Sequence, residues 1–324
     1  MLYNFSKGVS QLANRKDKKE NNNEEKGFSK VAINWYPGHM AKAKRLIEDD
    51  LKLIDIVIEV IDARIPISSR NPDLNEMVNN KKKIVVLNKS DLADDIQTKK
   101  WKEYLTNNDT VAISVNALNN NKNNEIINTI EKLMKEEKEK GIEKGRVGRT
   151  TRVLILGIPN VGKSSLINRL SNKNRQIVGN KPGVTVKKQW IRIGNNIELL
   201  DTPGVLWPKF ETEEIALNLA YTGTIKDEVL DNLEIAYNLL KFLLNNYRKN
   251  LEETYKLDEE QVAELLQNEN QMENENIMDV MRLIGKKRGA VMAGGNIDEN
   301  KTANMIIKDF RDAKIGRITL ELLK

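Results

Sequence analysis

The chain lacks several features, and each absence excludes a class of protein. Its 324 residues include no cysteine, so neither disulfide bonds nor thiolate metal sites can form. No apolar run approaches the roughly 20 residues that a membrane-spanning helix needs, and the polar first residues hold no apolar stretch of signal-peptide length. No internal repeat of fixed period is present. We therefore expect a cytoplasmic protein with no membrane partner.

Positive charge is concentrated in the first two thirds of the chain. Residues 1–208 contain 37 Lys and Arg against 25 Asp and Glu, a balance of +12, whereas residues 209–324 contain 16 against 22, a balance of −6. The basic excess suits a polyphosphate ligand or a nucleic acid, or it serves solubility alone. With 39% hydrophobic residues at this length, the chain is expected to form two domains.

Apolar segments of strand length alternate with helical patterns in the first part of the chain. Strands are expected at 54–62, 84–87, 110–114, 152–156 and 197–200, and helices at 41–53 and 126–134. Such alternation indicates an α/β fold with a parallel sheet and crossover helices. Beyond Pro208 only helical patterns remain, at 235–247, 259–268, 277–287 and 302–313. We therefore predict a disordered basic, Asn-rich leader over 1–30, an α/β domain over 31–208 and a mainly helical domain over 209–324.

A glycine-rich segment, Gly157–Ser164, fits the pattern G-x-x-x-x-G-K-[ST] between an apolar strand and a helical segment. Backbone N–H groups of such a loop surround phosphates, and its glycines permit the close approach. We expect Lys163 to reach the β- and γ-phosphates. Nucleotide contacts are expected from Asn160, Val161, Gly162, Lys163, Ser164 and Ser165. The pattern does not distinguish ATP from GTP, and a chance glycine-rich turn is the competing interpretation.

The segment Asn88–Asp91 fits N-K-x-D at the end of an expected strand. A carboxylate there can accept hydrogen bonds from N1–H and the exocyclic amino group of guanine, a donor pattern that adenine lacks. These residue types are common in surface turns, but the strand end is where open α/β sheets bind ligands. We therefore predict guanine contacts from Asn88, Lys89 and Asp91, and a weaker second base-contacting loop at Ser114, Val115 and Asn116.

The segment Asp201–Gly204 fits D-x-x-G, again at a strand end. We expect the backbone N–H of Gly204 to contact the γ-phosphate. Thr185 lies between the two phosphate motifs in sequence, where a switch threonine completes the Mg²⁺ coordination. The predicted Mg²⁺ ligands are therefore Ser164, Thr185 and Asp201.

The order of these motifs differs from that of ordinary small GTPases. There the glycine-rich loop comes first and N-K-x-D follows D-x-x-G, whereas N-K-x-D comes first here. The sequence therefore predicts a circularly permuted P-loop GTPase domain that keeps the same sheet. Because the segment after Gly204 runs directly into the helical region, we expect the nucleotide state to be coupled to the orientation of the helical domain.

In its motifs the chain resembles bacterial ribosome biogenesis GTPase A, a family of circularly permuted GTPases. The resemblance runs from about Ile33 to the C-terminus, through NWYPGHMAKAKR, DARIPISSRNP, NKSD, GIPNVGKSSLINRL, PGVT, LLDTPGVLWPKF and GKKRGAVMAGG. The predicted leader over residues 1–30 is not part of this resemblance. The resemblance implies GTP hydrolysis in late maturation of the large (50S) ribosomal subunit, with the GTP-bound form engaging rRNA in the subunit precursor. We expect a monomer away from the ribosome.

Hydrolysis needs a group that positions water. Many GTPases use a glutamine just after D-x-x-G, but Val205 and Leu206 stand there. His39, the only histidine, can orient water or accept its proton near neutral pH, and the resemblance assigns a catalytic role to this histidine. The competing interpretation is that His39 merely packs in a turn. The catalytic candidates are His39, Lys163 and Thr185.

Asn160 is a candidate ligand for K⁺, because related GTPases use an asparagine at this loop position for that ion. An ordinary polar loop residue is the competing interpretation. Basic candidates for RNA contact are Lys42, Lys44, Arg45, Lys81 to Lys83, Lys187, Lys188, Lys286 to Arg288, Arg311, Lys314 and Arg317.

Two alternative functions stay open. The protein could be a nucleotide-gated switch for RNA or protein binding, with hydrolysis only as a slow reset. It could also be a permuted GTPase that acts on the small subunit.

Overall fold

The computed structural model describes residues 45, 47–116, 123–136, 139, 143, 149–171, 189–194, 196–207, 210–225, 231–267 and 273–324. The chain divides into two compact units, Met1–Val31 and Ala32–Lys324, and all described residues belong to the second unit. The predicted leader, His39 and Thr185 lie outside the described residues.

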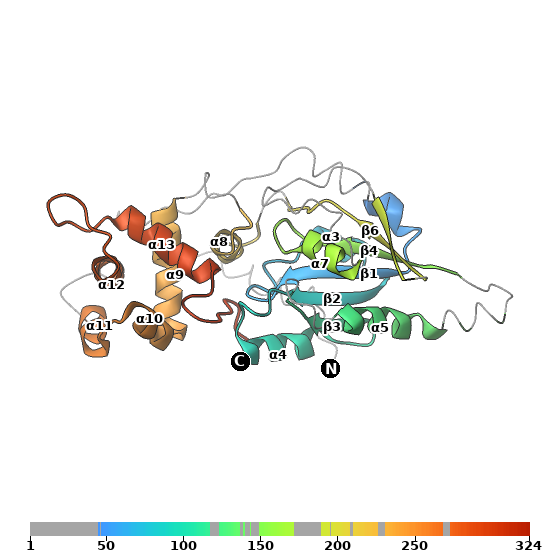
Figure 1. Ribbon diagram of the computed structural model, residues 1–324, viewed down its shortest axis with the longest axis horizontal. Helices are drawn as coiled ribbons and strands as arrows, with labels where there is room; N and C mark the ends of the chain where they lie inside the picture. Colours follow the sequence, from blue (N-terminus) through green and yellow to red (C-terminus); the bar gives the residue numbers. More distant parts are fainter. Residues whose placement is uncertain are drawn as a thin grey trace, which may run out of the picture. The chain divides into compact units, whose positions relative to one another are not determined.

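The described strands of the first part of the chain form one six-stranded sheet (Figure 1). Its order is β3-β2-β1-β4-β6-β5, and all neighbouring pairs are parallel except β5 and β6. The strands are β1 Ile56–Asp62, β2 Lys82–Asn88, β3 Thr110–Ser114, β4 Thr151–Leu156, β5 Gln189–Ile193 and β6 Ile197–Asp201. The predicted parallel α/β sheet is thus confirmed, with one antiparallel edge strand, β5, that the sequence patterns did not predict.

Helices cover both faces of the sheet. Along β2 the side chains of Ile84 and Val86 pack in one core cluster and those of Val85 and Leu87 in another, as the period of two in a strand requires. The first cluster includes α5 (Asn123–Leu133) and α7 (Lys163–Leu170), and the second includes α4 (Asp95–Leu105). Because β1 and β2 are buried on both faces, apolar residues dominate both strands without alternating with polar ones.

The C-terminal part is helical, as predicted. Its helices are α8 Glu213–Tyr221, α9 Asn232–Asn246, α10 Arg248–Tyr255, α11 Glu259–Leu266, α12 Glu273–Lys287 and α13 Glu299–Arg311. Figure 1 shows α9 to α13, coloured orange to red, as one group of packed helices. The sequence patterns predicted neither α8 nor α10. In the described part of this region, the only strand-like pairing is an isolated bridge between Val291 and Ile297. None of the helices described in this chain is long and apolar enough to span a membrane.

Candidate functional site

The predicted nucleotide motifs follow strands that end at the same edge of the sheet. Asn88 ends β2, Ser114 ends β3 and Asp201 ends β6, and the loop that begins at Gly157 follows β4. Because these four strands are parallel, their carboxyl ends lie side by side. This edge is where open α/β sheets bind ligands.

The glycine-rich loop needs its glycines because of its backbone shape. Gly162 has a φ of 95° and precedes α7, and a Cβ there would lie 2.2 Å from Nδ2 of Asn88. The same Nδ2 donates a hydrogen bond of 2.6 Å to the carbonyl of Val161. Asn88 of N-K-x-D therefore braces the glycine-rich loop from the neighbouring strand, and backbone N–H groups at the start of α7 provide an anion-binding end.

Lys163 is buried at the start of α7. Its Nζ donates hydrogen bonds to the carbonyls of Gly157 at 3.0 Å and Ile158 at 2.8 Å, so the loop wraps around the ammonium group. Burial lowers the pKa of Lys163 to about 8, and the carboxylate of Asp201 opposes this shift only in part. The loop therefore holds a cation that phosphate oxygens would stabilise.

The D-x-x-G segment lies against the glycine-rich loop. Asp201 is buried at the end of β6, and the hydroxyl of Thr202 donates to the carbonyl of Ile155 at 2.6 Å. A Cβ on Gly204 would lie 2.8 Å from both the backbone nitrogen of Pro159 and Nζ of Lys163. Only glycine fits this close approach, which brings the D-x-x-G backbone beside the phosphate-binding lysine.

Two loops meet on the predicted base side. The N–H of Ser90 donates to the carbonyl of Val115 at 3.2 Å, which joins the N-K-x-D loop to the segment after β3. The guanidinium group of Arg169 donates to the carbonyl of Asn116 from α7. Asp91, the residue after Ser90, is exposed. Its carboxylate is therefore accessible to a base.

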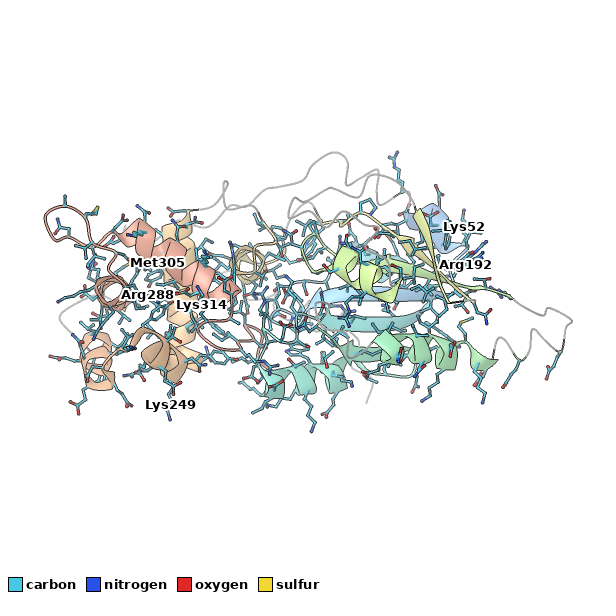
Figure 2. The ribbon with its side chains drawn as sticks, in the orientation of Figure 1. Lys52, Arg192, Lys249, Arg288, Met305 and Lys314 are labelled. Atoms are coloured by element: carbon cyan, nitrogen blue, oxygen red, sulfur yellow. The ribbon has the colours of Figure 1, made fainter. Side chains whose placement is uncertain are left out.

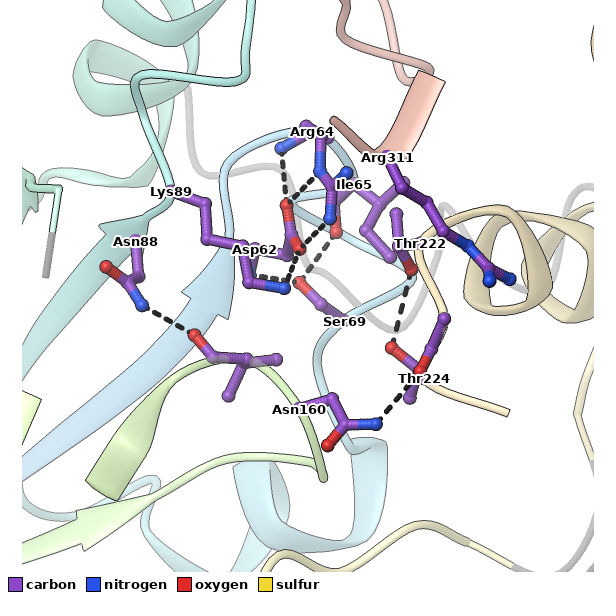
Figure 3. A network of polar contacts seen from close by, with 12 residues as sticks. Asp62, Arg64, Ile65, Ser69, Asn88, Lys89, Asn160, Thr222, Thr224 and Arg311 are labelled. Atoms are coloured by element: carbon purple, nitrogen blue, oxygen red, sulfur yellow. Dashed lines mark hydrogen bonds and ion pairs between the residues drawn. The ribbon is translucent and has the colours of Figure 1, made fainter. Parts of the chain in front are cut away.

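A buried charge network binds Lys89 of this loop, and the sequence patterns gave no site role to its other members, Asp62, Arg64 and Ser69 (Figure 3). Asp62, the last residue of β1, accepts hydrogen bonds from Nε of Arg64 at 3.0 Å and Nη2 of Arg64 at 2.8 Å, and pairs with Nζ of Lys89 at 2.9 Å. Its backbone N–H donates to the hydroxyl of Ser69 at 3.0 Å. Burial opposes the charge on Asp62, but Arg64 and Lys89 outweigh it and hold the pKa well below its usual range. The lysine of N-K-x-D is therefore held by the last residue of β1, which Arg64 and Ser69 of the following segment hold in turn.

Asn71 connects the same segment to D-x-x-G. Its Nδ2 donates to the carbonyl of Val205 at 2.9 Å, while its Oδ1 accepts from the N–H of Leu74 as the N-cap of α3 (Pro72–Met77). The stretch DARIPISSRNP thus contacts both the base side and the phosphate side of the site. The sequence marked this stretch only as polar residues that directly follow an apolar strand and as part of the family resemblance.

Not all predicted site residues can be compared with the structure. The structure places the following predicted residues at strand ends, in the loops after them and at the start of α7, all at one edge of the sheet: Asn88, Lys89, Asp91, Asn160 to Ser165, Asp201 and Gly204. His39 and Thr185 lie outside the described residues. No cluster of three or more His, Cys, Asp or Glu side chains suited to a metal ion occurs among the residues described. The specific roles of all these residues therefore stay predictions.

The fold and motif order define a P-loop GTPase domain in circularly permuted order. Residues 152–281 match the protein-family model described as "50S ribosome-binding GTPase". The chain is 45% identical over 291 residues to "Ribosome biogenesis GTPase A" of Bacillus cereus, covering 90% of this chain and 94% of that one. The protein of the same description from Bacillus licheniformis is 45% identical over 293 residues, covering 90% and 98%. The chain belongs to the ribosome biogenesis GTPase A family, and it is a GTPase.

Solved structures agree with this assignment. "GDP-bound structue of TM YlqF" matches with a TM-score of 0.57 and 26% identity, covering 86% of this chain and 98% of that chain. The structure described as "Crystal structure of GNP-bound YlqF from T. maritima" matches with a TM-score of 0.54 and 26% identity, covering 86% and 97%. The predicted fold and family are thus confirmed.

Proposed function

We propose that this GTPase assists late maturation of the large ribosomal subunit, and that its GTP-bound form binds rRNA in the subunit precursor. The observation that carries the proposal is the 45% identity over 90% of the chain to proteins described as ribosome biogenesis GTPase A. The family description "50S ribosome-binding GTPase" favours the large subunit over the small one. Such a role takes place in the cytoplasm, with the protein acting as a monomer away from the ribosome.

The site geometry supports the proposed nucleotide contacts. Lys163 would pair with the β- and γ-phosphates, the N–H of Gly204 would contact the γ-phosphate, and Asp91 would accept hydrogen bonds from guanine. Two similar solved structures are described as GDP-bound and GNP-bound, which supports guanine-nucleotide binding by this chain. Asn160 would supply an oxygen to K⁺ beside the phosphates.

Mg²⁺ fits the donor chemistry of the site. Ser164, which carries a hydroxyl group, follows Lys163 at the start of α7, and Asp201, which carries a carboxylate, is the last residue of β6. Mg²⁺ prefers oxygen ligands and is usually held by one or two protein groups together with substrate phosphates and water. Ser164 and Asp201, with Thr185, would hold the ion, and it would offset charge on the β- and γ-phosphates.

The predicted RNA contacts differ in their surroundings. Arg311, Arg317 and Lys82 are engaged with backbone carbonyls of the chain itself. Arg288 and Lys314, both labelled in Figure 2, lie 3.4 Å and 3.0 Å from the carboxylate of Asp309. Lys286 and Lys287 are exposed at the end of α12. Within the helical region we therefore assign the rRNA contact first to Lys286 and Lys287.

The proposal is tested by measuring GTP turnover with and without isolated large and small ribosomal subunits. We expect the large subunit to increase turnover and to co-sediment with the protein in the presence of a non-hydrolysable GTP analogue, but not with GDP. Stimulation by the small subunit alone would reassign the partner. If neither subunit changed the rate or bound the GTP form, ribosome assembly would be the wrong function.

The variant Lys286→Ala with Lys287→Ala should weaken the co-sedimentation and reduce its dependence on salt. Lys249→Ala is a matched control, because Lys249 is exposed on α10, outside all the predicted basic clusters. A nucleotide-gated switch with slow hydrolysis predicts a different result: subunit binding that depends on GTP, with no change in turnover.

A further inference from the structure

A segment near the end of the chain, residues 317–323, binds the loop that carries Asp91. The guanidinium group of Arg317 donates to the carbonyl of Ser90 at 2.6 Å through Nη2 and to the carbonyl of Ala93 at 2.9 Å through Nε. It also pairs with the carboxylate of Asp95. One arginine thus binds two carbonyls of the loop between β2 and α4 and the first residue of α4.

Backbone groups extend this contact. The N–H of Ile318 donates to the carbonyl of Leu92 at 3.1 Å, and the N–H of Asp94 donates to the hydroxyl of Thr319 at 3.1 Å. Ile318 and Thr319 are fully or almost fully buried. Residues 317–319 therefore form hydrogen bonds with every residue from Ser90 to Asp95 except Asp91.

The other side of the 317–323 segment is anchored to the loop after β1. The N–H of Leu320 donates to the carbonyl of Arg64 at 2.8 Å. The half-buried carboxylate of Glu321 accepts hydrogen bonds from the N–H of Ser68 at 2.7 Å and from its hydroxyl. The indole N–H of Trp101 on α4 donates to the carbonyl of Glu321 at 2.7 Å. The segment is therefore a fixed support and not a loosely attached end.

This support has a consequence for base selection. A carboxylate that accepts two hydrogen bonds from guanine must be held to a fraction of an ångström, and that position depends on the residues around it. On one side of Asp91, Ser90 is held by Val115 and Arg317; on the other, Leu92 is held by Lys89 and Ile318. The nucleotide-binding loop is thus completed by a residue from beyond the last helix.

We propose that Arg317 is a positioning residue for guanine selectivity, holding the N-K-x-D loop so that Asp91 meets both guanine donors. The inference rests on the proposed contact between Asp91 and guanine. Loss of Arg317 is therefore expected to weaken a base that gives Asp91 two hydrogen bonds more than a base that gives it one. The preference for guanine should decline even though Arg317 does not touch the base.

The test compares the affinities of GDP and inosine diphosphate by titration calorimetry in the full-length protein. Inosine keeps N1–H but lacks the exocyclic amino group, so it can give Asp91 only one hydrogen bond. For Arg317→Ala we expect the affinity for GDP to fall about tenfold, and that for inosine diphosphate to fall much less. Arg317→Lys should give an intermediate ratio, because one ammonium cannot span two carbonyls and a carboxylate.

Arg282→Ala is the matched control. Arg282 is also in the helical region and binds three carboxylates, those of Glu275, Asp279 and Glu299. Its loss should leave the ratio of the two affinities unchanged. If Arg317→Ala lowered both affinities equally, or neither, the positioning role would be overturned; if that variant failed to fold, an unchanged ratio in Arg317→Lys would overturn it.

A further variant separates this inference from the proposed function on which it rests. Asp91→Asn should abolish the preference for GDP over inosine diphosphate. If Asp91→Asn kept that preference, the proposed guanine contact would be wrong and the role of Arg317 would fall with it. If Asp91→Asn lost the preference and Arg317→Ala kept it, only the role of Arg317 would be wrong.

Discussion

The side chain of Asn160 in the glycine-rich loop donates a hydrogen bond of 2.9 Å from Nδ2 to the carbonyl of Gly223, in the turn after α8 (Figure 3). The carbonyls of the last two residues of α8, directly before that turn, accept hydrogen bonds from Arg311 of α13: Tyr221 at 2.9 Å and Ala220 at 2.8 Å. The phosphate-binding loop is therefore linked to the helical region through α8, in addition to the direct chain connection after Gly204. A displacement of Asn160 on nucleotide binding would be transmitted to α13 through the turn after α8 and Arg311.

The first prediction concerns the two ends of the Asn160 amide. The Nδ2 end is used by Gly223, whereas K⁺ would bind the Oδ1 end, so the two roles can be separated. We expect turnover to be about tenfold higher in KCl than in NaCl, because the cation would offset negative charge beside the phosphates. Asn160→Ala should remove this difference, and Asn160→Asp, which keeps an oxygen but loses the donor, should retain it. Equal rates of the unmodified protein in both salts would exclude the K⁺ role.

The second prediction is a pH dependence of nucleotide binding. The pKa of Lys163 falls from 10.5 to about 8 because the side chain is buried. Phosphates stabilise the charged form, so the pKa is higher in the complex. Below about pH 8 the lysine is already protonated, so the affinity for the nucleotide does not change with pH. Above about pH 8 the lysine must take up a proton when the nucleotide binds, and the affinity therefore falls by up to tenfold for each pH unit.

Calorimetry in buffers of different ionisation enthalpy measures this uptake directly. We expect almost no uptake at pH 7 and an increasing fraction of a proton at pH 9. Arg does not titrate in this range, so the residual binding of Lys163→Arg should show no such pH dependence. A flat affinity of the unmodified protein from pH 7 to pH 9.5 would mean that Lys163 keeps its proton in the nucleotide-free protein.

A feature could be predicted from the sequence when the residues that form it lie close together along the chain. The strand β3 was predicted at its exact bounds, and β2 at its core, because β-branched runs form buried strands. The strand β5 was missed, because its short, partly polar sequence QWIRI pairs only at the sheet edge. The motifs themselves identified the nucleotide-binding loops, since each is a local pattern with a local function.

The contacts that support those loops have no local pattern. Arg317 lies 227 residues from Ser90, and Asn71 lies 134 residues from Val205. From sequence, Arg317 was one of several cations assigned to RNA, and Asp62 was only part of a family resemblance. Their partners depend on which chain segments the fold brings together, and neither charge nor spacing could identify them.

The third prediction concerns His39. The variant His39→Ala should abolish the turnover stimulated by the large ribosomal subunit and leave the affinity for GTP unchanged, because a water-positioning group acts in the transition state and not in nucleotide binding. Single-turnover hydrolysis and nucleotide titration measure the two effects separately. Unchanged stimulated turnover would remove His39 from the mechanism and favour its role in packing a turn.

The fourth prediction separates the two roles of Asn71. Asn71→Asp keeps an oxygen to cap α3 but loses the donor to the carbonyl of Val205, whereas Asn71→Ala loses both. We expect Asn71→Ala to lower the free energy of unfolding by about 1–2 kcal/mol. Asn71→Asp should retain the cap but increase hydrogen exchange at residues 205–207, where a carboxylate would face a carbonyl. Unaltered exchange in both variants would show that this hydrogen bond does not hold the segment after D-x-x-G.

The last prediction concerns Asp62, the buried carboxylate that binds Arg64 and Lys89. Asp62→Asn leaves two cations without their counter-charge, and we expect the free energy of unfolding to fall by about 3–5 kcal/mol in urea at pH 7. Because the pKa of Asp62 lies below its ordinary value of 3.8, the unfolded chain takes up the proton first. The carboxylate therefore stabilises the fold at neutral pH, and this contribution is lost as the pH falls below that value. Asp62→Asn should lack this part of the acid dependence. Glu139→Gln is the control, because its pair with Lys135 is exposed and 3.9 Å apart, and such pairs contribute little. An equal stability loss in the two variants would mean that the buried network does not stabilise the loop beneath the guanine site.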